Sequence, residues 1–125
     1  MTDLILSNRV PKELLVHRPG KWDLVVIASL KSGALRFNAL KSEIGDISQK
    51  VLTSTLRELE RNGFVCRTQY PSIPPRVEYE LTELGTHLLE FTEVWVTFVK
   101  KHGREIATAR QEFDRLNDGG PVDQA

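Results

Sequence analysis

The sequence predicts an α+β fold that is mainly helical, and three observations support this prediction. Apolar residues recur at helical spacing through most of the 125-residue chain. An alternation of apolar and charged residues that is typical of a strand occurs only between residues 64 and 81, around a proline-rich segment. A further helical pattern covers residues 83–116. This order of helix, turn, helix and hairpin predicts a winged helix-turn-helix with helices on both sides of it.

Short helices are predicted ahead of the helix-turn-helix. Residues 12–16 are expected to form a short helix inside an N-terminal arm of residues 1–19. Residues 22–30 and 37–44 are expected to be core helices, and residues 35–36 between them could form a short strand that pairs with the hairpin. The positions expected to face inward are Trp22, Val25, Val26 and Leu30 in the first core helix, and Phe37, Leu40 and Ile44 in the second.

Residues 45–48 predict the tight turn of the motif. Gly45 permits a sharp bend, and the Ser48 side chain can cap the helix that follows. Residues 49–61 then form an amphipathic helix, because its apolar and polar residues separate at helical spacing. Its apolar side holds Leu52, Thr55, Leu56 and Leu59, and its polar side holds Lys50, Thr53, Ser54, Arg57 and Arg61.

The polar side of residues 49–61 has two interpretations. Short hydroxyl side chains beside long cationic ones can bind base edges and phosphates, as a recognition helix requires. Alternatively, this is the ordinary solvated face of an amphipathic helix, although such a face more often alternates Glu with Lys. Because Glu58 and Glu60 come late in the helix and lie off the centre of the basic stripe, DNA contact is the favoured interpretation.

Residues 64–69 and 76–81 predict the two strands of the hairpin. In the second strand apolar residues alternate with charged ones, which is the period of a half-buried strand. Residues 70–75 between the strands include three prolines, so the tip is expected to be stiff. A stiff tip next to Arg76 suits a minor groove or phosphates; the alternative is a plain loop without contacts. Cys66 in the first strand is expected to be a small buried hydrophobe.

The chain after residue 82 predicts helices with an apolar stripe. Thr82 is the expected N-cap of a helix that ends near Gly103, and a shorter helix follows. Residues 83–116 of two chains could bury their stripes against each other in a homodimer. Alternatively, the stripe could pack on the winged-helix core of its own chain. Residues 117–125 are expected to be a disordered tail. The candidate dimer-interface residues are Leu84, Leu88, Phe91, Trp95, Phe98, Ile106 and Phe113.

Composition argues against several other classes of protein. The longest apolar run, residues 24–30, is too short to span a bilayer, and the N-terminus has no export pattern, so we expect a cytoplasmic protein without membrane contact. A single cysteine excludes an internal disulfide, and no Cys/His spacing predicts a metal site or other cofactor. The three histidines are scattered and no phosphate-binding loop or nucleophile motif is present, which argues against an enzyme.

Charge is distributed unevenly along the chain, although the net charge is zero. Residues 31–76 contain eight Lys and Arg against four Asp and Glu, whereas residues 77–125 contain five against ten. Phosphate contacts depend on charges within about one Debye length, roughly 10 Å at 0.1 M salt. A neutral chain with a basic segment can therefore bind double-stranded DNA with a salt-dependent affinity.

These residues resemble the HxlR-type winged-helix transcriptional regulators of bacteria and archaea. The resemblance covers roughly residues 20–90 and rests on four blocks in the family's order. The blocks are residues 20–22 (Gly-Lys-Trp), residues 36–40 (Arg-Phe-Asn-Ala-Leu), residues 47–53 with 56–59 (Ile-Ser-Gln-Lys-Val-Leu-Thr and Leu-Arg-Glu-Leu), and residues 74–82 (Pro-Pro-Arg-Val-Glu-Tyr-Glu-Leu-Thr).

The resemblance implies a sequence-specific DNA-binding regulator that acts as a homodimer on a palindromic operator. Residues 20–82 would be the DNA-binding domain, with the recognition helix in the major groove, the wing on the minor groove or backbone, and the terminal helices at the dimer interface. These roles carry over to Gln49, Lys50, Thr53, Ser54 and Arg57 for the major groove and to Arg76 for the wing. The full set of candidate DNA-binding residues also includes Arg36, Ser48 and Arg61.

One departure from the family pattern concerns thiol sensing. Several members sense oxidants through a cysteine shortly before the Gly-Lys-Trp block, whereas the nearest match here is Val10-Pro11. A small-molecule effector of unknown identity is therefore retained as a candidate partner. The rival interpretation of the whole chain is a winged helix that binds another protein instead of DNA, and its expected loss of basic residues is not seen at Lys50, Arg57 and Arg61.

Overall fold

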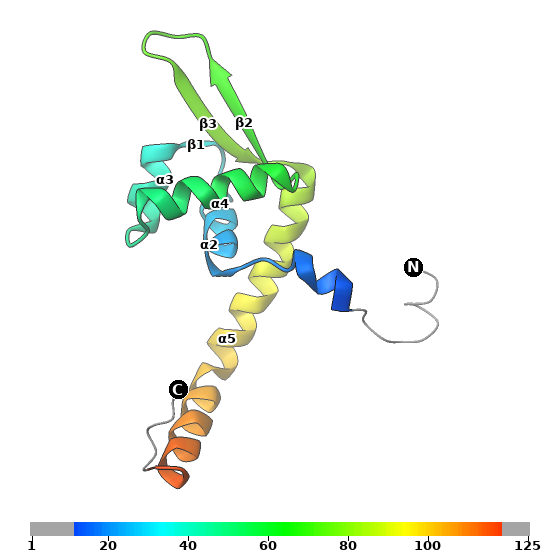
Figure 1. Ribbon diagram of the computed structural model, residues 1–125, viewed down its shortest axis with the longest axis vertical. Coiled ribbons are helices and arrows are strands. Elements are labelled where there is room, and N and C mark those ends of the chain that lie inside the picture. Colours follow the sequence, from blue (N-terminus) through cyan, green and yellow to red (C-terminus); the bar gives the residue numbers. More distant parts are fainter. Residues whose placement is uncertain (1–11, 119–125) are drawn as a thin grey trace, which may run out of the picture. The chain divides into compact units, whose positions relative to one another are not determined.

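The computed structural model describes residues 12–118, and its order of elements confirms the mainly helical α+β class (Figure 1). The predicted arm before residue 12 and the predicted disorder after residue 118 lie outside the described residues. The elements are η1 (Lys12–His17, a 3-10 helix), α2 (Lys21–Ser29), β1 (Leu35–Arg36), α3 (Phe37–Ile44), α4 (Gln49–Arg61), β2 (Val65–Tyr70), β3 (Arg76–Leu81) and α5 (Glu83–Leu116).

Local hydrogen bonds explain where the helices begin. At the start of α2 the Asp23 carboxylate accepts a hydrogen bond of 2.8 Å from the Gly20 backbone N–H. At the start of α4 the Ser48 Oγ accepts one of 3.1 Å from the Val51 N–H, which confirms the predicted cap. Between α3 and α4 the backbone of Gly45 has φ of 92°, a conformation that a residue with a Cβ adopts only with strain.

The hydrophobic core lies where α2, α3 and α4 meet one end of the sheet. The four predicted inward positions of α4 are all buried, and so are Val26, Leu30 and Leu40. Trp22, Phe37 and Ile44 are partly buried against this cluster. The cluster consists of Val26, Ile27, Leu30, Leu40, Ile47, Leu52, Leu56, Leu59, Val65 and Leu89.

The sheet has three antiparallel strands in the order β1-β3-β2. Leu35 lies opposite Tyr79, which confirms that the two-residue strand pairs with the hairpin. Beyond β1, the strands β2 and β3 continue as a hairpin that projects away from the helices (Figure 1). Because side chains alternate between the faces of a strand, Val65 and Arg67 share the face that turns toward α4.

The expectation that Cys66 is buried was wrong, because Cys66 is exposed. Its neighbour Val65 is 2% exposed and occupies the core position. Since successive side chains point to opposite faces of a strand, Cys66 must lie on the outer face. Its sulfur lies 3.9 Å from the Thr68 hydroxyl, which is the next residue on that face.

The prediction of two C-terminal helices was also wrong, because α5 is a single helix of 34 residues. Gly103 lies in its interior without interrupting it. A glycine inside a helix costs only about 1 kcal/mol relative to alanine, and no proline follows it to stop the helix. The chain divides into two compact units between Leu89 and Glu90, so the first two turns of α5 belong to the winged-helix unit.

The start of α5 is fixed to the turn between α4 and β2. The Thr82 hydroxyl donates a 2.6 Å hydrogen bond to the Gly63 carbonyl and accepts one of 3.0 Å from the Gly85 N–H, which confirms Thr82 as the helix cap. The Thr82 N–H donates to the Phe64 carbonyl at 3.1 Å. Gly85 is buried here, and a Cβ at this position would collide with the Phe64 carbonyl oxygen.

We therefore predict that Gly85→Ala destabilises the winged-helix unit. The added methyl group must displace a backbone carbonyl, and overpacking of this kind costs about 1 to 3 kcal/mol. Gly103→Ala is the matched control in the same helix, because no atom lies within 4 Å of its Cβ position, and it should be neutral or more stable by about 1 kcal/mol. Urea unfolding followed by circular dichroism measures both; equal stabilities of the two variants would contradict the close contact.

Candidate nucleic-acid interface

The exposed side of α4 brings five of the predicted DNA-binding residues together. They line one shallow surface depression of about 640 Å³, and all five side chains are exposed. Lys50 and Arg57 make no ion pair with any other residue in the range 12–118, so both cations are available to an anionic partner. The five residues are Gln49, Lys50, Thr53, Ser54 and Arg57.

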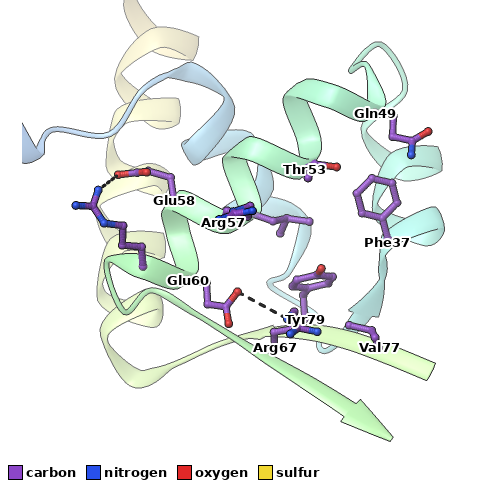
Figure 2. Close-up of a pocket in the computed structure, with 11 residues that line it drawn as sticks. Phe37, Gln49, Thr53, Arg57, Glu58, Glu60, Arg67, Val77 and Tyr79 are labelled. Carbon is purple, nitrogen blue, oxygen red and sulfur yellow. Dashed lines mark hydrogen bonds and ion pairs between the residues drawn. The ribbon is translucent and has the colours of Figure 1, made fainter. Parts of the chain in front are cut away.

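A larger groove of about 1030 Å³ lies between α4 and the sheet. Figure 2 shows Gln49, Thr53 and Arg57 along α4 on one side, and Arg67, Val77 and Tyr79 on the strands opposite. Phe37, at the start of α3, lines the groove beside Gln49 (Figure 2). Three arginines, two glutamates and two aromatic rings thereby line the same open space.

The remaining predicted residues of the helix-turn-helix have more restricted surroundings. The Ser48 hydroxyl is engaged as the cap of α4. Arg61, at the last turn of α4, forms a 3.3 Å ion pair with Glu58, and both side chains are mostly exposed. Arg36 is exposed in β1, opposite Glu78 of β3. These three residues do not line the depression that joins the other five.

Arg76 lies on the sheet face opposite to the groove. Its guanidinium carbon is 4.3 Å from the centre of the Tyr70 ring, and its Nε is 3.3 Å from a Glu78 carboxylate oxygen. The Arg76 side chain is 37% exposed, so it is less accessible than the predicted role as a phosphate contact assumed. Its stacking on Tyr70 stabilises the last pair of the hairpin below the tip.

The tip itself is compact and fully solvated. Residues 71–75 are exposed, and Ile73 at their centre has no protection from solvent. The Ser72 hydroxyl donates a 2.8 Å hydrogen bond to the Pro74 carbonyl, and the Ser72 N–H donates one of 2.8 Å to the Tyr70 carbonyl. Two short hydrogen bonds and three prolines therefore restrict the backbone conformations open to the tip.

Sequence reasoning missed the groove residues of the strands, Arg67 above all. The sequence pattern did not single out Arg67, and it indicated only that residues 76–81, which include Tyr79, form a half-buried strand. The available signal was the alternation of side chains along β2, because it places Arg67 on the same face as the core residue Val65. The length of the strand beyond the core could not be read from that pattern.

The apolar side chains predicted for the dimer interface lie along α5, and most are exposed. Trp95 and Phe98 are 49% and 45% exposed, and their rings stack with centres 5.6 Å apart. Leu88 differs because it is partly buried against the core of the winged-helix unit. Val94, Val96 and Val99, which the spacing did not single out, are exposed as well. The other exposed interface candidates are Leu84, Phe91, Ile106 and Phe113.

Residues 12–118 contain neither a membrane-spanning helix nor a metal-binding cluster. No helix there is long and apolar enough to cross a membrane. No group of three or more His, Cys, Asp or Glu side chains in the same range is arranged to hold a metal ion.

Comparison with known proteins identifies the family. The model of the HxlR-like helix-turn-helix family matches residues 19–107. The chain belongs to this family. Among curated relatives, the chain is 35% identical over 101 residues to YtfH of Escherichia coli, an uncharacterised HTH-type transcriptional regulator, with 81% of this chain and 80% of the relative covered.

Solved structures agree with this assignment. The transcriptional regulator YtfH from Salmonella typhimurium is 31% identical, with a TM-score of 0.69 over 80% of this chain and 89% of that one. The redox regulator HypR in its reduced form is 32% identical, with a TM-score of 0.71 over 78% and 96% of the two chains. This HxlR-like protein is accordingly a transcriptional regulator with a DNA-binding helix-turn-helix domain.

We predict that Ser48→Ala lowers stability even without DNA. Removing the hydroxyl leaves the Val51 N–H without its cap, and such substitutions cost about 1 kcal/mol. Ser54→Ala is the matched control, because this exposed hydroxyl in the middle of α4 only donates to the Val51 carbonyl, and its loss should cost less than about 0.5 kcal/mol. Chemical unfolding measures the free energy of unfolding of both variants. Equal losses in the two would show that the Ser48 cap makes no specific contribution to stability.

Proposed function

We propose that this HxlR-like protein binds a pseudo-palindromic operator sequence-specifically as a homodimer. The observation that carries the proposal is the convergence of five exposed polar side chains on one side of α4, with two cations free of ion pairs. In this proposal α4 enters the major groove, which has room for a helix and presents a distinct pattern of donors and acceptors for each base pair.

The side chains on α4 divide by the chemistry they offer. Arg57 can donate two hydrogen bonds to a guanine edge, and Gln49 can pair with adenine in the same bidentate manner. Thr53 and Ser54 are short enough to contact a base edge or a phosphate closely. Lys50, in the first turn of α4, is suited to a phosphate as a point charge. The set therefore combines base recognition with backbone anchoring.

The hairpin is proposed to contact the neighbouring minor groove or its backbone. The hydrogen-bonded, proline-rich tip favours this, because a rigid element loses little conformational entropy on binding. Arg76 would act from the outer face below the tip, where its side chain is 37% exposed beside Tyr70.

The exposed apolar side chains of α5 support the proposal of a dimer. Aromatic residues in the second unit leave about half of their surface in water, which favours a partner surface of the same kind. A second copy of the chain supplies an identical stripe, and a two-fold dimer is the most common way to pair such surfaces. Two recognition helices related in this way would read half-sites about one helical turn apart.

The direct test of the proposed function is selection of binding sequences from random duplexes, followed by footprinting. We expect inverted half-sites with protection on both, and a stoichiometry of two chains per duplex. A single unrepeated half-site occupied by one chain would contradict the dimer. An absence of any sequence preference would contradict specific recognition.

Arg57→Ala is predicted to weaken operator binding and to relax its specificity. Loss of a bidentate guanine contact costs about 1 to 3 kcal/mol and should change the preference at one position in each half-site. Arg76→Ala serves as the comparison and should weaken operator and unrelated duplex evenly. Titrations by fluorescence anisotropy measure both; a uniform loss for Arg57→Ala would make it a backbone contact.

Trp95→Ala is predicted to weaken the dimer. If Trp95 lies in the interface, its truncation removes a large apolar contact from each subunit and should raise the dimer dissociation constant by roughly 30-fold or more. Operator affinity should fall with it, although no group on α4 is changed. Ile73→Ala is the control, because it removes a more exposed apolar side chain from the hairpin tip and should leave the dimer intact. Sedimentation equilibrium measures the dimer dissociation constant of each variant. A Trp95→Ala protein that stays fully dimeric would place the interface elsewhere.

A further inference from the structure

The face of the hairpin that turns toward α4 changes character along its length. Its first cross-strand pair is Val65 with Leu81, in and beside the core. The next pair is Arg67 with Tyr79, and both residues line the groove between α4 and the sheet. The face of the sheet that covers the core thus continues past the helices. On β2, the first residue of this face beyond the pair of Val65 and Leu81 is the cation Arg67.

Arg67 is held only loosely in this groove. Its Nε lies 3.9 Å from the Glu60 Oε1, too far for a hydrogen bond, and the two side chains are 42% and 43% exposed. Figure 2 shows this pair bridging the groove from the last turns of α4 to β2. Exposed ion pairs of this kind contribute little to stability. An anion that enters the groove and binds the Arg67 guanidinium more tightly can therefore displace the Glu60 carboxylate.

We propose that Arg67 binds a phosphate of the DNA backbone and that Glu60 restrains it in the DNA-free protein. The inference rests on the proposed function. A helix in the major groove and a hairpin at the adjoining minor groove must lie on either side of one sugar-phosphate strand, because that strand separates the two grooves. The space between α4 and the hairpin is the groove that Arg67 lines. A phosphate there lies between Arg57 on the helix and Arg67 on the strand.

The chemistry of the two partners sets the direction of the exchange. A guanidinium offers several donors in one plane and forms strong, often bidentate hydrogen bonds with phosphate. When Arg67 turns to a phosphate, Glu60 keeps its negative charge next to the backbone without a close cation. Glu60 therefore opposes DNA binding at every sequence, and its removal should favour binding.

Arg67 differs in this respect from Arg76, the wing cation that the sequence singled out. Arg76 stacks on Tyr70 and lies 3.3 Å from the Glu78 carboxylate on the outer face. No aromatic ring is stacked on Arg67 within the described residues, and its acidic partner is farther away. Arg67 therefore gives up weaker interactions than Arg76 does when it turns toward DNA.

The test measures affinity for the selected operator and for an unrelated duplex at several salt concentrations. Arg67→Ala should weaken binding to both duplexes by roughly tenfold at low salt, and should reduce the slope of log K against log salt by about 0.9 per bound subunit. Arg67→Lys should restore most of the slope but only part of the affinity. Glu60→Gln should tighten binding to both duplexes about two- to fivefold.

Arg115→Ala is the matched control. Arg115 also pairs with a glutamate, Glu112 at 2.6 Å, but it lies at the end of α5 in the other compact unit. This variant should leave both affinity and salt slope unchanged. Circular dichroism verifies that each variant is folded before its affinity is compared.

Three results would overturn the inference. Wild-type affinity and slope in Arg67→Ala would remove Arg67 from the interface while leaving the proposed function intact. A weaker Glu60→Gln protein would show that Glu60 positions Arg67 for DNA instead of restraining it. If the wild-type protein binds neither duplex, the proposed function fails and the inference fails with it.

Discussion

Helix α4 buries its leucine side in the core of the winged-helix unit, and this burial fixes the rotation of the helix about its axis. Leu52, Leu56 and Leu59 are at most 2% exposed, in contact with α2 and β2. Removing each such side chain from water contributes about 1.5 to 3 kcal/mol, so the helix cannot rotate about its axis without a large loss of stability. The opposite side is thereby held outward. The same packing that stabilises the fold also presents the polar side chains to a partner.

A second constraint places the hairpin relative to α4. Thr82 and Gly85 fasten the start of α5 to the turn after α4, and Gly85 permits an approach to the Phe64 backbone that no other residue allows. The hairpin leaves from that fastened point, so its inner face and α4 enclose the groove. Val65 belongs to the core and Arg67 lines the groove, so one strand contributes to the core at its start and to the groove wall farther along.

Ion pairing explains how a chain without net charge can bind an anionic partner. Three arginines near the groove and the wing have glutamate partners, namely Arg61 with Glu58, Arg67 with Glu60 and Arg76 with Glu78. Each of these pairs is at least partly exposed and contributes little to stability. In the DNA-free protein these glutamates reduce the positive electrostatic potential of the groove and the wing. Lys50 and Arg57 on α4 have no such partner among the described residues, so the positive potential is centred on them.

Local patterns in the sequence predicted the order of elements as far as β3, the tight turn at Gly45, the cap at Ser48 and the division of α4 into two sides. These depend on local bonding and on helical periodicity, which operate within a few residues of the chain. Other features could not be read from these local patterns. Cys66 is exposed because Val65 takes the core position, and α5 continues through Gly103 because one glycine does not outweigh the helix around it. Arg67 meets the recognition helix only because β2 and β3 pair in one register and extend past the core, a long-range arrangement that no local pattern encodes.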